Sequence, residues 1–226
     1  MSLKSKQVRA DFFTKEARRK GYPARSVFKL QEIDKKFKLF SRPLKAKQVV
    51  DLGCSPGSWS MYAAEKVGKN GSVFGVDLKP LSQTTKFAPQ IKSVVADIND
   101  WRKEAPGELT GNCTHVISDM APNTTGNAFV DGVASVDLCH MALDVAEKLL
   151  KPRGNVVLKV FDCSEKQEIE ERIQQRFKQL KRFKPKSTRD FSREYFLVGI
   201  DFVPTGPEPD AALRSPTESH LATTPE

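Results

Sequence analysis

Three charged residues lie in or beside apolar segments, where a charge needs a partner or a function. Lys159 lies inside NVVLKVF, which predicts a buried central strand, whereas Asp119 ends HVISD and Glu194 begins EYFLVGI. A buried ammonium is costly unless it is paired. Lys159 therefore either neutralises a buried carboxylate, extends its amine to solvent, or lies beside Asp119 as a general base. Glu194 can pair with Lys29 or Lys159, or serve solubility on an edge strand.

Residues 49–61, VVDLGCSPGSWSM, combine an apolar run, a glycine-containing turn and a sequence that favours a helix from Ser58. Nucleotide-like ligands bind at such a position in open α/β sheets, and Gly53 and Gly57 allow the backbone to approach them closely. The GxxxG spacing differs from the dinucleotide motif GxGxxG, and no Lys-Ser or Lys-Thr follows as in a P-loop. The loop favours an adenosyl ligand such as S-adenosylmethionine, although a plain turn between core elements has the same pattern.

Aspartates follow three successive predicted strands, in VFGVD (Asp77), SVVAD (Asp97) and HVISD (Asp119). Asp77 comes 24 residues after Gly53 (77 − 53), near the offset at which an acidic side chain reaches a ribose hydroxyl. Asp97 is placed to accept a hydrogen bond from an adenine amino group or from the backbone. A single aspartate at a strand end is commonly a cap, but three beside a glycine loop favour a cofactor cleft.

The elements that must position these residues alternate between strand and helix patterns. This alternation predicts an α/β fold with a doubly wound, mostly parallel sheet and helices on both faces. Strands are predicted at 48–52, 72–76, 91–95, 115–118, 155–161 and 194–202, and helices at 7–20, 24–37, 134–149 and 169–180. We divide the chain into a basic helical extension at 1–47, a cofactor-binding domain at 48–202, and a disordered, proline-rich tail at 203–226.

The charge of the chain is concentrated at its beginning. The first 47 of the 226 residues contain 15 Lys/Arg and 4 Asp/Glu. The net positive charge of this segment alone therefore exceeds the net +9 of the whole chain. Such a segment is suited to binding phosphates, or is simply a solvated face. The four cysteines form no CxxC pair and the three histidines are scattered, so we expect no metal site. No apolar run approaches the ~20 residues of a membrane span, and we expect no membrane partner.

Six segments in order resemble the FtsJ-type (RrmJ-like) ribosomal RNA ribose 2′-O-methyltransferases, over residues 8–201. They are ARSVFKLQEID, VVDLGCSPGSWS, GVDLKP, SDMAPNTTG, LKPRGNVVLKVF and KPKSTRDFSREYFLVG. The resemblance implies a Rossmann-like sheet of seven strands whose last strand is antiparallel. It also implies methyl transfer from S-adenosylmethionine to a ribose 2′-hydroxyl of RNA, with a uridine of large-subunit ribosomal RNA as the expected substrate. Cys54, Ser55 and Ser58 depart from Ala-Ala and Gly in many members, as small-for-small changes.

By the same resemblance, a catalytic tetrad falls on Lys29, Asp119, Lys159 and Glu194. Lys159 would orient and deprotonate the ribose hydroxyl, and Lys29 would help to place the substrate. The implied cofactor positions are Gly53, Gly57, Trp59, Asp77, Asp97 and Asp119. The expected partner is ribosomal RNA or a ribosomal particle, bound through the basic N-terminal segment together with 181–186 and Arg189. We expect a monomer in the cytoplasm, and leave a nucleolar or organellar location open.

Three other functions fit parts of the sequence. A transfer RNA anticodon-loop 2′-O-methyltransferase of the same superfamily is the nearest, although DMAPN and SREYF favour the ribosomal branch. A NAD-dependent oxidoreductase is disfavoured by the missing GxGxxG. A non-catalytic RNA-binding protein is disfavoured by the complete tetrad.

Overall fold

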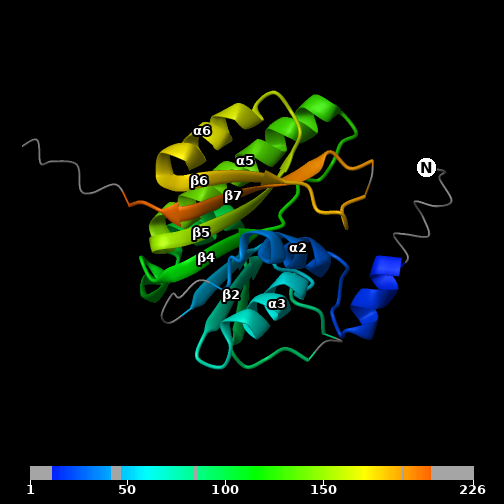
Figure 1. Ribbon diagram of the computed structural model, residues 1–226, viewed down its shortest axis with the longest axis vertical. Coiled ribbons are helices and arrows are strands. Elements are labelled where there is room, and N and C mark those ends of the chain that lie inside the picture. Colours follow the sequence, from blue (N-terminus) through cyan, green and yellow to red (C-terminus); the bar gives the residue numbers. More distant parts are fainter. Residues whose placement is uncertain (1–11, 42–46, 84–85, 190, 205–226) are drawn as a thin grey trace, which may run out of the picture.

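A seven-stranded sheet lies between two layers of helices in the computed structural model (Figure 1), which describes residues 12–41, 47–83, 86–189 and 191–204. Its strand order is β3-β2-β1-β4-β5-β7-β6. Strand β7 runs antiparallel to both of its neighbours, and the other recorded pairings are parallel. The strands are β1 Gln48–Leu52, β2 Ser72–Asp77, β3 Ile91–Val95, β4 Cys113–Ser118, β5 Leu150–Phe161, β6 Phe177–Phe183 and β7 Glu194–Phe202.

Each face of the sheet is covered by its own group of helices. Helices α2 (Val27–Phe37) and α3 (Ser58–Val67) pack on one face, where Val27, Leu30 and Ile33 are fully buried in a single apolar cluster. Helices α4 (Ile98–Glu104), α5 (Ala128–Leu149) and α6 (Lys166–Arg176) contribute to the cluster on the other face. Burial of these apolar stripes at roughly 25 cal/mol per Å² fixes both layers against the strands.

The architecture confirms the predicted fold class and the antiparallel last strand. Strands predicted at 48–52, 91–95 and 194–202 have those bounds, whereas α2 begins three residues later than predicted, at Val27. Of the helix predicted at 7–20, residues 12–19 are helical and residues 7–11 lie outside the described part. The predicted tail also lies outside it, apart from Val203 and Pro204. No described helix is long and apolar enough to span a membrane.

The helix predicted at 169–180 is wrong in its last four residues. Helix α6 ends at Arg176, and Phe177–Phe183 forms strand β6 instead. Apolar residues continue at helical spacing through Phe177 and Leu180, which is why a helix was predicted there. Without β6 beside it, however, β7 would be a long, apolar and unpaired edge of the sheet. Pairing with β7 places Phe177 beside Phe202, with 5.3 Å between ring centroids, and this tertiary contact outweighs the local periodicity.

The strand order reverses direction between β1 and β4, which are neighbours in the sheet. Open α/β sheets bind ligands at the carboxyl ends of the strands beside such a reversal. The turn after β1 begins at Gly53, and Asp119 directly follows β4. The topology therefore brings two of the predicted site segments to the same edge of the sheet.

Candidate active site

A cavity of about 320 Å³ lies at this edge of the sheet. Gly53 and Met120 meet across the β1–β4 boundary at its base: Gly53 has φ +74°, and a Cβ there would lie 2.6 Å from Met120 Cγ. Only glycine fits both the left-handed backbone and this close approach. The cavity is just within the range of roughly 300–1,000 Å³ typical of small-molecule sites.

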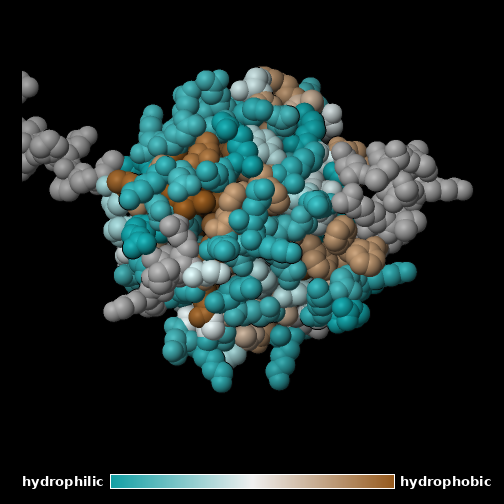
Figure 2. All heavy atoms as spheres, in the orientation of Figure 1, coloured by the Kyte–Doolittle hydropathy of each residue, from teal (hydrophilic) through white to brown (hydrophobic). Residues whose placement is uncertain are grey.

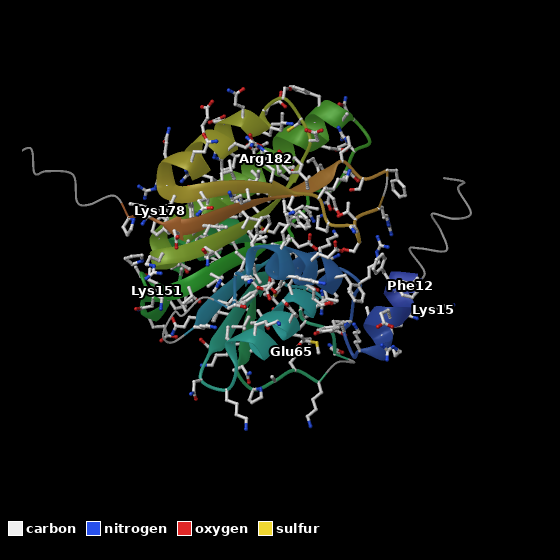
Figure 3. The ribbon with its side chains drawn as sticks, in the orientation of Figure 1. Phe12, Lys15, Glu65, Lys151, Lys178 and Arg182 are labelled. Carbon is white, nitrogen blue, oxygen red and sulfur yellow. The ribbon has the colours of Figure 1, made fainter. Side chains whose placement is uncertain are left out.

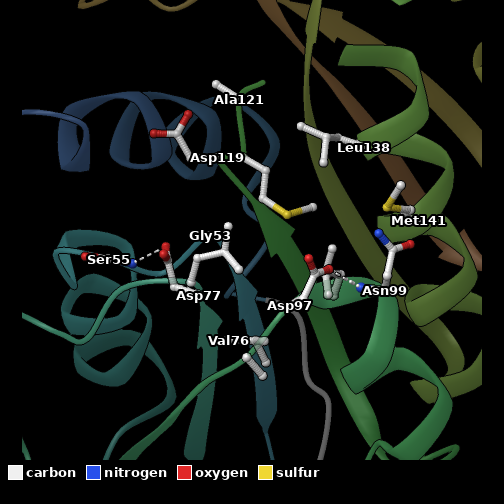
Figure 4. A pocket seen from close by; sticks show the side chains of 14 residues that line it. Gly53, Ser55, Val76, Asp77, Asp97, Asn99, Asp119, Ala121, Leu138 and Met141 are labelled. Carbon is white, nitrogen blue, oxygen red and sulfur yellow. Dashed lines mark hydrogen bonds between the residues drawn. The ribbon is translucent and has the colours of Figure 1, made fainter. Parts of the chain in front are cut away.

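Two carboxylates on neighbouring strands line the cavity in fixed orientations (Figure 4). Asp77 accepts hydrogen bonds from the backbone N–H groups of Ser55 and Lys79, both at 2.8 Å. Asp97 accepts one from the N–H of Asn99, also at 2.8 Å, and caps helix α4. Each carboxylate oxygen retains lone pairs for a further donor, such as a ribose hydroxyl or an amine.

The rest of the cavity wall is largely apolar. Figure 4 shows Leu138 and Met141 of α5 facing Val76 and the aspartates across the cavity. A flat aromatic base fits between such walls, while a ribose fits against the carboxylates. Sequence reasoning did not identify the walls from α5, because their spacing is the same as that of core residues on any amphipathic helix. The residues that line the cavity are Gly53, Ser55, Val76, Asp77, Leu78, Ala96, Asp97, Ile98, Asn99, Asp119, Met120, Ala121, Leu138 and Met141.

Gly57 and Trp59, also expected to contact the cofactor, do not line this cavity. Gly57 precedes α3 with φ +113°, and a Cβ there would lie 2.4 Å from Phe87. The Trp59 indole is buried: its Nε1 donates to the backbone oxygen of Ser26 at 2.9 Å, and its ring lies 5.8 Å from that of Phe196. The side chain of Trp59 thus joins α2 to α3, and a cofactor contact by either residue stays a prediction.

The four residues of the predicted tetrad form one charged cluster. Lys159 Nζ lies 3.1 Å from Asp119 Oδ1 and also donates to the backbone oxygen of Asp119. Lys29 Nζ lies 2.6 Å from Glu194 Oε1 and 3.7 Å from Asp119 Oδ1. All four side chains are at most 16% exposed. The cluster is therefore charge-balanced, and Asp119 links its two lysines.

Four elements position the cluster. Lys159 of β5 pairs with Phe196 of β7, and Glu194 pairs with Phe161, so the side chains of Lys159 and Glu194 project from the same face of the sheet. Helix α2 lies on that face, and its Lys29 Nζ lies 5.8 Å above the Phe196 ring. Asp119 comes from the end of β4 and also lines the cavity. The two predicted sites, for cofactor and for catalysis, thus share Asp119.

A fully buried carboxylate lies beneath the site. Asp51 of β1 is 0% exposed, and its Oδ2 accepts a hydrogen bond from Ser60 Oγ at 2.6 Å. Burial raises the pKa of Asp51 to about 7, the Ser60 hydroxyl opposes that rise, and the charges of Asp119 and Asp77 add to it. Sequence reasoning treated Asp51 only as a strand end, although its place in the apolar run VVDL is the signal of a buried acid.

This burial predicts a pH-dependent stability. Between about pH 4 and pH 7 the folded chain keeps a proton on Asp51 that the unfolded chain has lost, so the free energy of unfolding should fall as the pH rises, by at most about 1.4 kcal/mol per pH unit. Asp51→Asn keeps an acceptor for Ser60 and removes the titration. Urea unfolding should therefore show the variant gaining stability over the wild type between pH 5 and pH 7.5. A constant difference between the two proteins would contradict the raised pKa.

A second, open groove of about 540 Å³ adjoins the cluster at Glu194. Glu194 contributes to its lining, as do four cationic side chains and Phe191. The charged cluster thus shares Asp119 with the cavity and Glu194 with the basic groove. Among the residues whose positions are described, no group of three or more His, Cys, Asp or Glu side chains is arranged to hold a metal ion.

The sheet order, the cavity at the β1–β4 reversal and the aspartates beside it define a Rossmann-like methyltransferase. A putative ribosomal RNA methyltransferase from Plasmodium falciparum has the same fold, with a TM-score of 0.67 and 25% identity over 81% of this chain and 100% of that one. Human methyltransferase-like protein 13, solved in complex with SAH, shares the fold with a TM-score of 0.53 at 14% identity, over 79% of this chain and 78% of that one.

The chain belongs to the FtsJ-like methyltransferase family, whose model matches residues 22–202. A relative in Desulfatibacillum aliphaticivorans, named ribosomal RNA large subunit methyltransferase E, is 42% identical over 87% of this chain and 92% of its own length. A protein of the same name in Bdellovibrio bacteriovorus is 41% identical over 84% of this chain and 95% of its own. The resemblance predicted from six motifs is confirmed, and the oxidoreductase and the non-catalytic alternatives are set aside.

Proposed function

We propose that this protein transfers a methyl group from S-adenosylmethionine to the 2′-hydroxyl of a uridine in large-subunit ribosomal RNA. The observation that carries the proposal is the position of the charged cluster, between the cavity that Asp119 lines and the groove that Glu194 lines. A donor in the cavity and an acceptor in the groove would meet at Lys159. The names of the relatives support ribosomal RNA as the substrate, in preference to transfer RNA.

The cavity fits S-adenosylmethionine in its chemistry. Asp77 would accept hydrogen bonds from the ribose hydroxyls, Asp97 would lie near the adenine, and the side chains of Leu138 and Met141 would cover the apolar base. The carboxylate of Asp119 lies where a positive charge on the ligand would be stabilised. When bound, this cofactor supplies an electrophilic methyl group on a sulfonium.

The residues of the cluster then act on the ribose hydroxyl. Lys159, after releasing the proton of its own ammonium to solvent, would hold the hydroxyl at its neutral amine and accept the hydroxyl proton as the oxygen forms its new bond. Asp119, 3.1 Å from Lys159, would stabilise the resulting ammonium. Lys29, held at 2.6 Å by Glu194, would fix the position of the acceptor ribose. Rigid placement of the oxygen in line with the methyl group supplies much of the remaining acceleration.

Cofactor binding tests the first half of this proposal. Asp77→Asn loses the charge that strengthens hydrogen bonds from the ribose, and its single carboxamide oxygen can accept from only one of the Ser55 and Lys79 amides. Titration calorimetry with S-adenosylmethionine should show one site, with an affinity reduced about tenfold or more in the variant. The control is Asp100→Asn, the same change at an 81% exposed side chain of α4. No binding by the wild type, or equal effects of the two substitutions, would contradict the assignment of the cavity.

Mapping of 2′-O-methyl groups tests the second half. Large-subunit ribosomal RNA from cells with and without the protein should differ at a uridine. The transfer RNA alternative predicts instead a missing methyl group in an anticodon loop, and that result would overturn the ribosomal assignment.

A further inference from the structure

The loop between β6 and β7, of which residues 184–189 and 191–193 are described, is attached to the helix that carries Lys29. The carboxylate of Glu32, one turn after Lys29 on α2, accepts hydrogen bonds from the backbone N–H groups of Lys186 at 2.7 Å and Ser187 at 2.9 Å. The loop ends directly at Glu194. Helix α2 therefore fixes the loop relative to the charged cluster, which makes side chains on this loop well placed to contact a substrate.

An aromatic ring on this loop is exposed to solvent. Phe191 is 71% exposed, and the guanidinium of Arg189 lies 5.9 Å from its ring centroid. A phenylalanine at this exposure contributes little to the core. It lies three residues before Glu194 and lines the same groove. The ring is thus a free planar surface at the substrate side of the cluster.

The cations around the ring differ in what they bind. Arg182 is paired with Glu170 at 2.7 Å, and Lys166 is paired with Asp162. Lys184 and Arg193 instead donate to backbone oxygens, of Ser192 at 2.7 Å and of Ala128 at 3.2 Å. Within the described ranges, no carboxylate lies within 4.0 Å of Lys184, Arg189 or Arg193 in an ion pair. Lys184 and Arg193 line the groove and Arg189 lies against the exposed ring, so three positive charges that form no described ion pair lie near Phe191.

We propose that this groove binds the nucleotide next to the target ribose in an unpaired RNA strand, with its base stacked on Phe191 and its phosphates held by Lys184, Arg189 and Arg193. The inference rests on the proposed function and assigns a specificity-determining site to it. Duplex RNA keeps its bases stacked inside the helix, so a free ring selects a splayed, single-stranded base. Aromatic rings combined with backbone-binding cations are the usual means of holding single strands.

Exposed cations also lie outside the groove, on strand β6. Figure 2 shows the face with α2 and β6 as mostly hydrophilic, with small hydrophobic areas between. The edge strand β6 carries exposed cations along its length, among them Lys178 and Arg182 (Figure 3). Lys178 lies near the start of β6 and therefore away from the catalytic edge, so it provides a control for charge effects.

The test of stacking compares two substitutions at one position. Phe191→Leu removes the ring and keeps an apolar side chain, whereas Phe191→Tyr keeps the ring. The probe is a fluorescein-labelled, single-stranded fragment of large-subunit ribosomal RNA that contains the mapped uridine. Fluorescence anisotropy should show a Kd raised roughly 5- to 150-fold for Phe191→Leu and within threefold of the wild type for Phe191→Tyr. The KM for RNA should rise in parallel, while kcat at saturating RNA and the affinity for S-adenosylmethionine stay within about threefold.

An abasic substrate identifies the stacked nucleotide. Removing the base on one side of the target uridine should weaken wild-type binding and eliminate the difference between wild type and Phe191→Leu. If neither neighbouring base has this effect, or if Phe191→Leu binds as the wild type does, the stacking site is wrong. Failure of the proposed function is separately visible, because the wild-type protein would then methylate no ribosomal RNA.

The salt dependence of RNA binding tests the proposed phosphate contacts. Each phosphate contact to a single strand contributes about 0.7 to the slope of log Kd against log salt concentration. Lys184→Gln combined with Arg189→Gln should therefore reduce that slope by about 1.4. The control, Lys69→Gln combined with Lys178→Gln, removes the same charge from exposed side chains near the starts of β2 and β6, at the opposite edge of the sheet. Equal slopes for the two double variants would overturn the phosphate contacts.

Discussion

Lys159→Met should abolish methyl transfer while leaving S-adenosylmethionine bound. The side chain is only 7% exposed, and methionine preserves its unbranched apolar stem in β5. Loss of a positioned general base commonly costs 10²- to 10⁴-fold, so kcat should fall by at least about a hundredfold. The cavity does not include Lys159 in its lining, so the cofactor Kd should change by less than about threefold.

The matched control for this prediction is Lys92→Met, the same change at an exposed lysine of β3. Filter-binding of labelled methyl groups on ribosomal RNA measures transfer, and calorimetry measures the cofactor. Transfer at the wild-type rate by Lys159→Met would remove Lys159 from the role of base. Loss of cofactor binding by this variant would show that Lys159 supports the cavity instead.

Asp119→Ala should be the most destabilising change in the cluster. Asp119 lies 3.1 Å from Lys159 and 3.7 Å from Lys29, and its removal leaves the nearly buried Lys159 ammonium without a carboxylate partner. Breaking a buried ion pair from one side costs about 3–5 kcal/mol, whereas an exposed pair is worth about 1 kcal/mol or less. The free energy of unfolding in urea should therefore fall by several kcal/mol, and both transfer and cofactor affinity should be lost.

Two further variants identify the cause of that loss. Asp100→Ala breaks an exposed pair with Lys103, at 3.4 Å, and should change stability by about 1 kcal/mol or less. Asp119→Leu combined with Lys159→Met removes both charges and should recover part of the stability without recovering transfer. Equal losses in Asp119→Ala and in the double variant would show that packing, and not an unpaired charge, explains the effect.

Three members of the charged cluster could be predicted because they contradict their surroundings, whereas Lys29 was predicted only from the family resemblance. A lysine in NVVLKVF and carboxylates at the ends of apolar strands are costly, and strand ends meet at one edge of a parallel sheet. The sequence also contained the six family motifs in order. The sequence left open whether Glu194 pairs with Lys29 or with Lys159, and it did not indicate that Asp119 links both lysines, because such distances depend on how α2 packs against the sheet.

Other features were missed for identifiable reasons. Strand β6 has apolar spacing that also fits a helix, and only its pairing with β7 decides between the two. The raised pKa of Asp51 depends on complete burial between β1 and α3, which a local pattern does not measure. The exposure of Phe191 is likewise a property of the folded loop, although its polar neighbours in RDFSR differ from the apolar ones of the buried Phe196 in EYFLVGI.

The most direct test of the central claim is the chemical position of the transferred methyl group. Large-subunit ribosomal RNA is incubated with the protein and methyl-labelled S-adenosylmethionine and then hydrolysed in alkali, which cleaves RNA only where a free 2′-hydroxyl attacks the neighbouring phosphate. Methylation of a ribose blocks that attack, so the label should appear in a dinucleotide that resists alkali and begins with uridine. Label released in ordinary mononucleotides would place the methyl group on a base and would contradict the account.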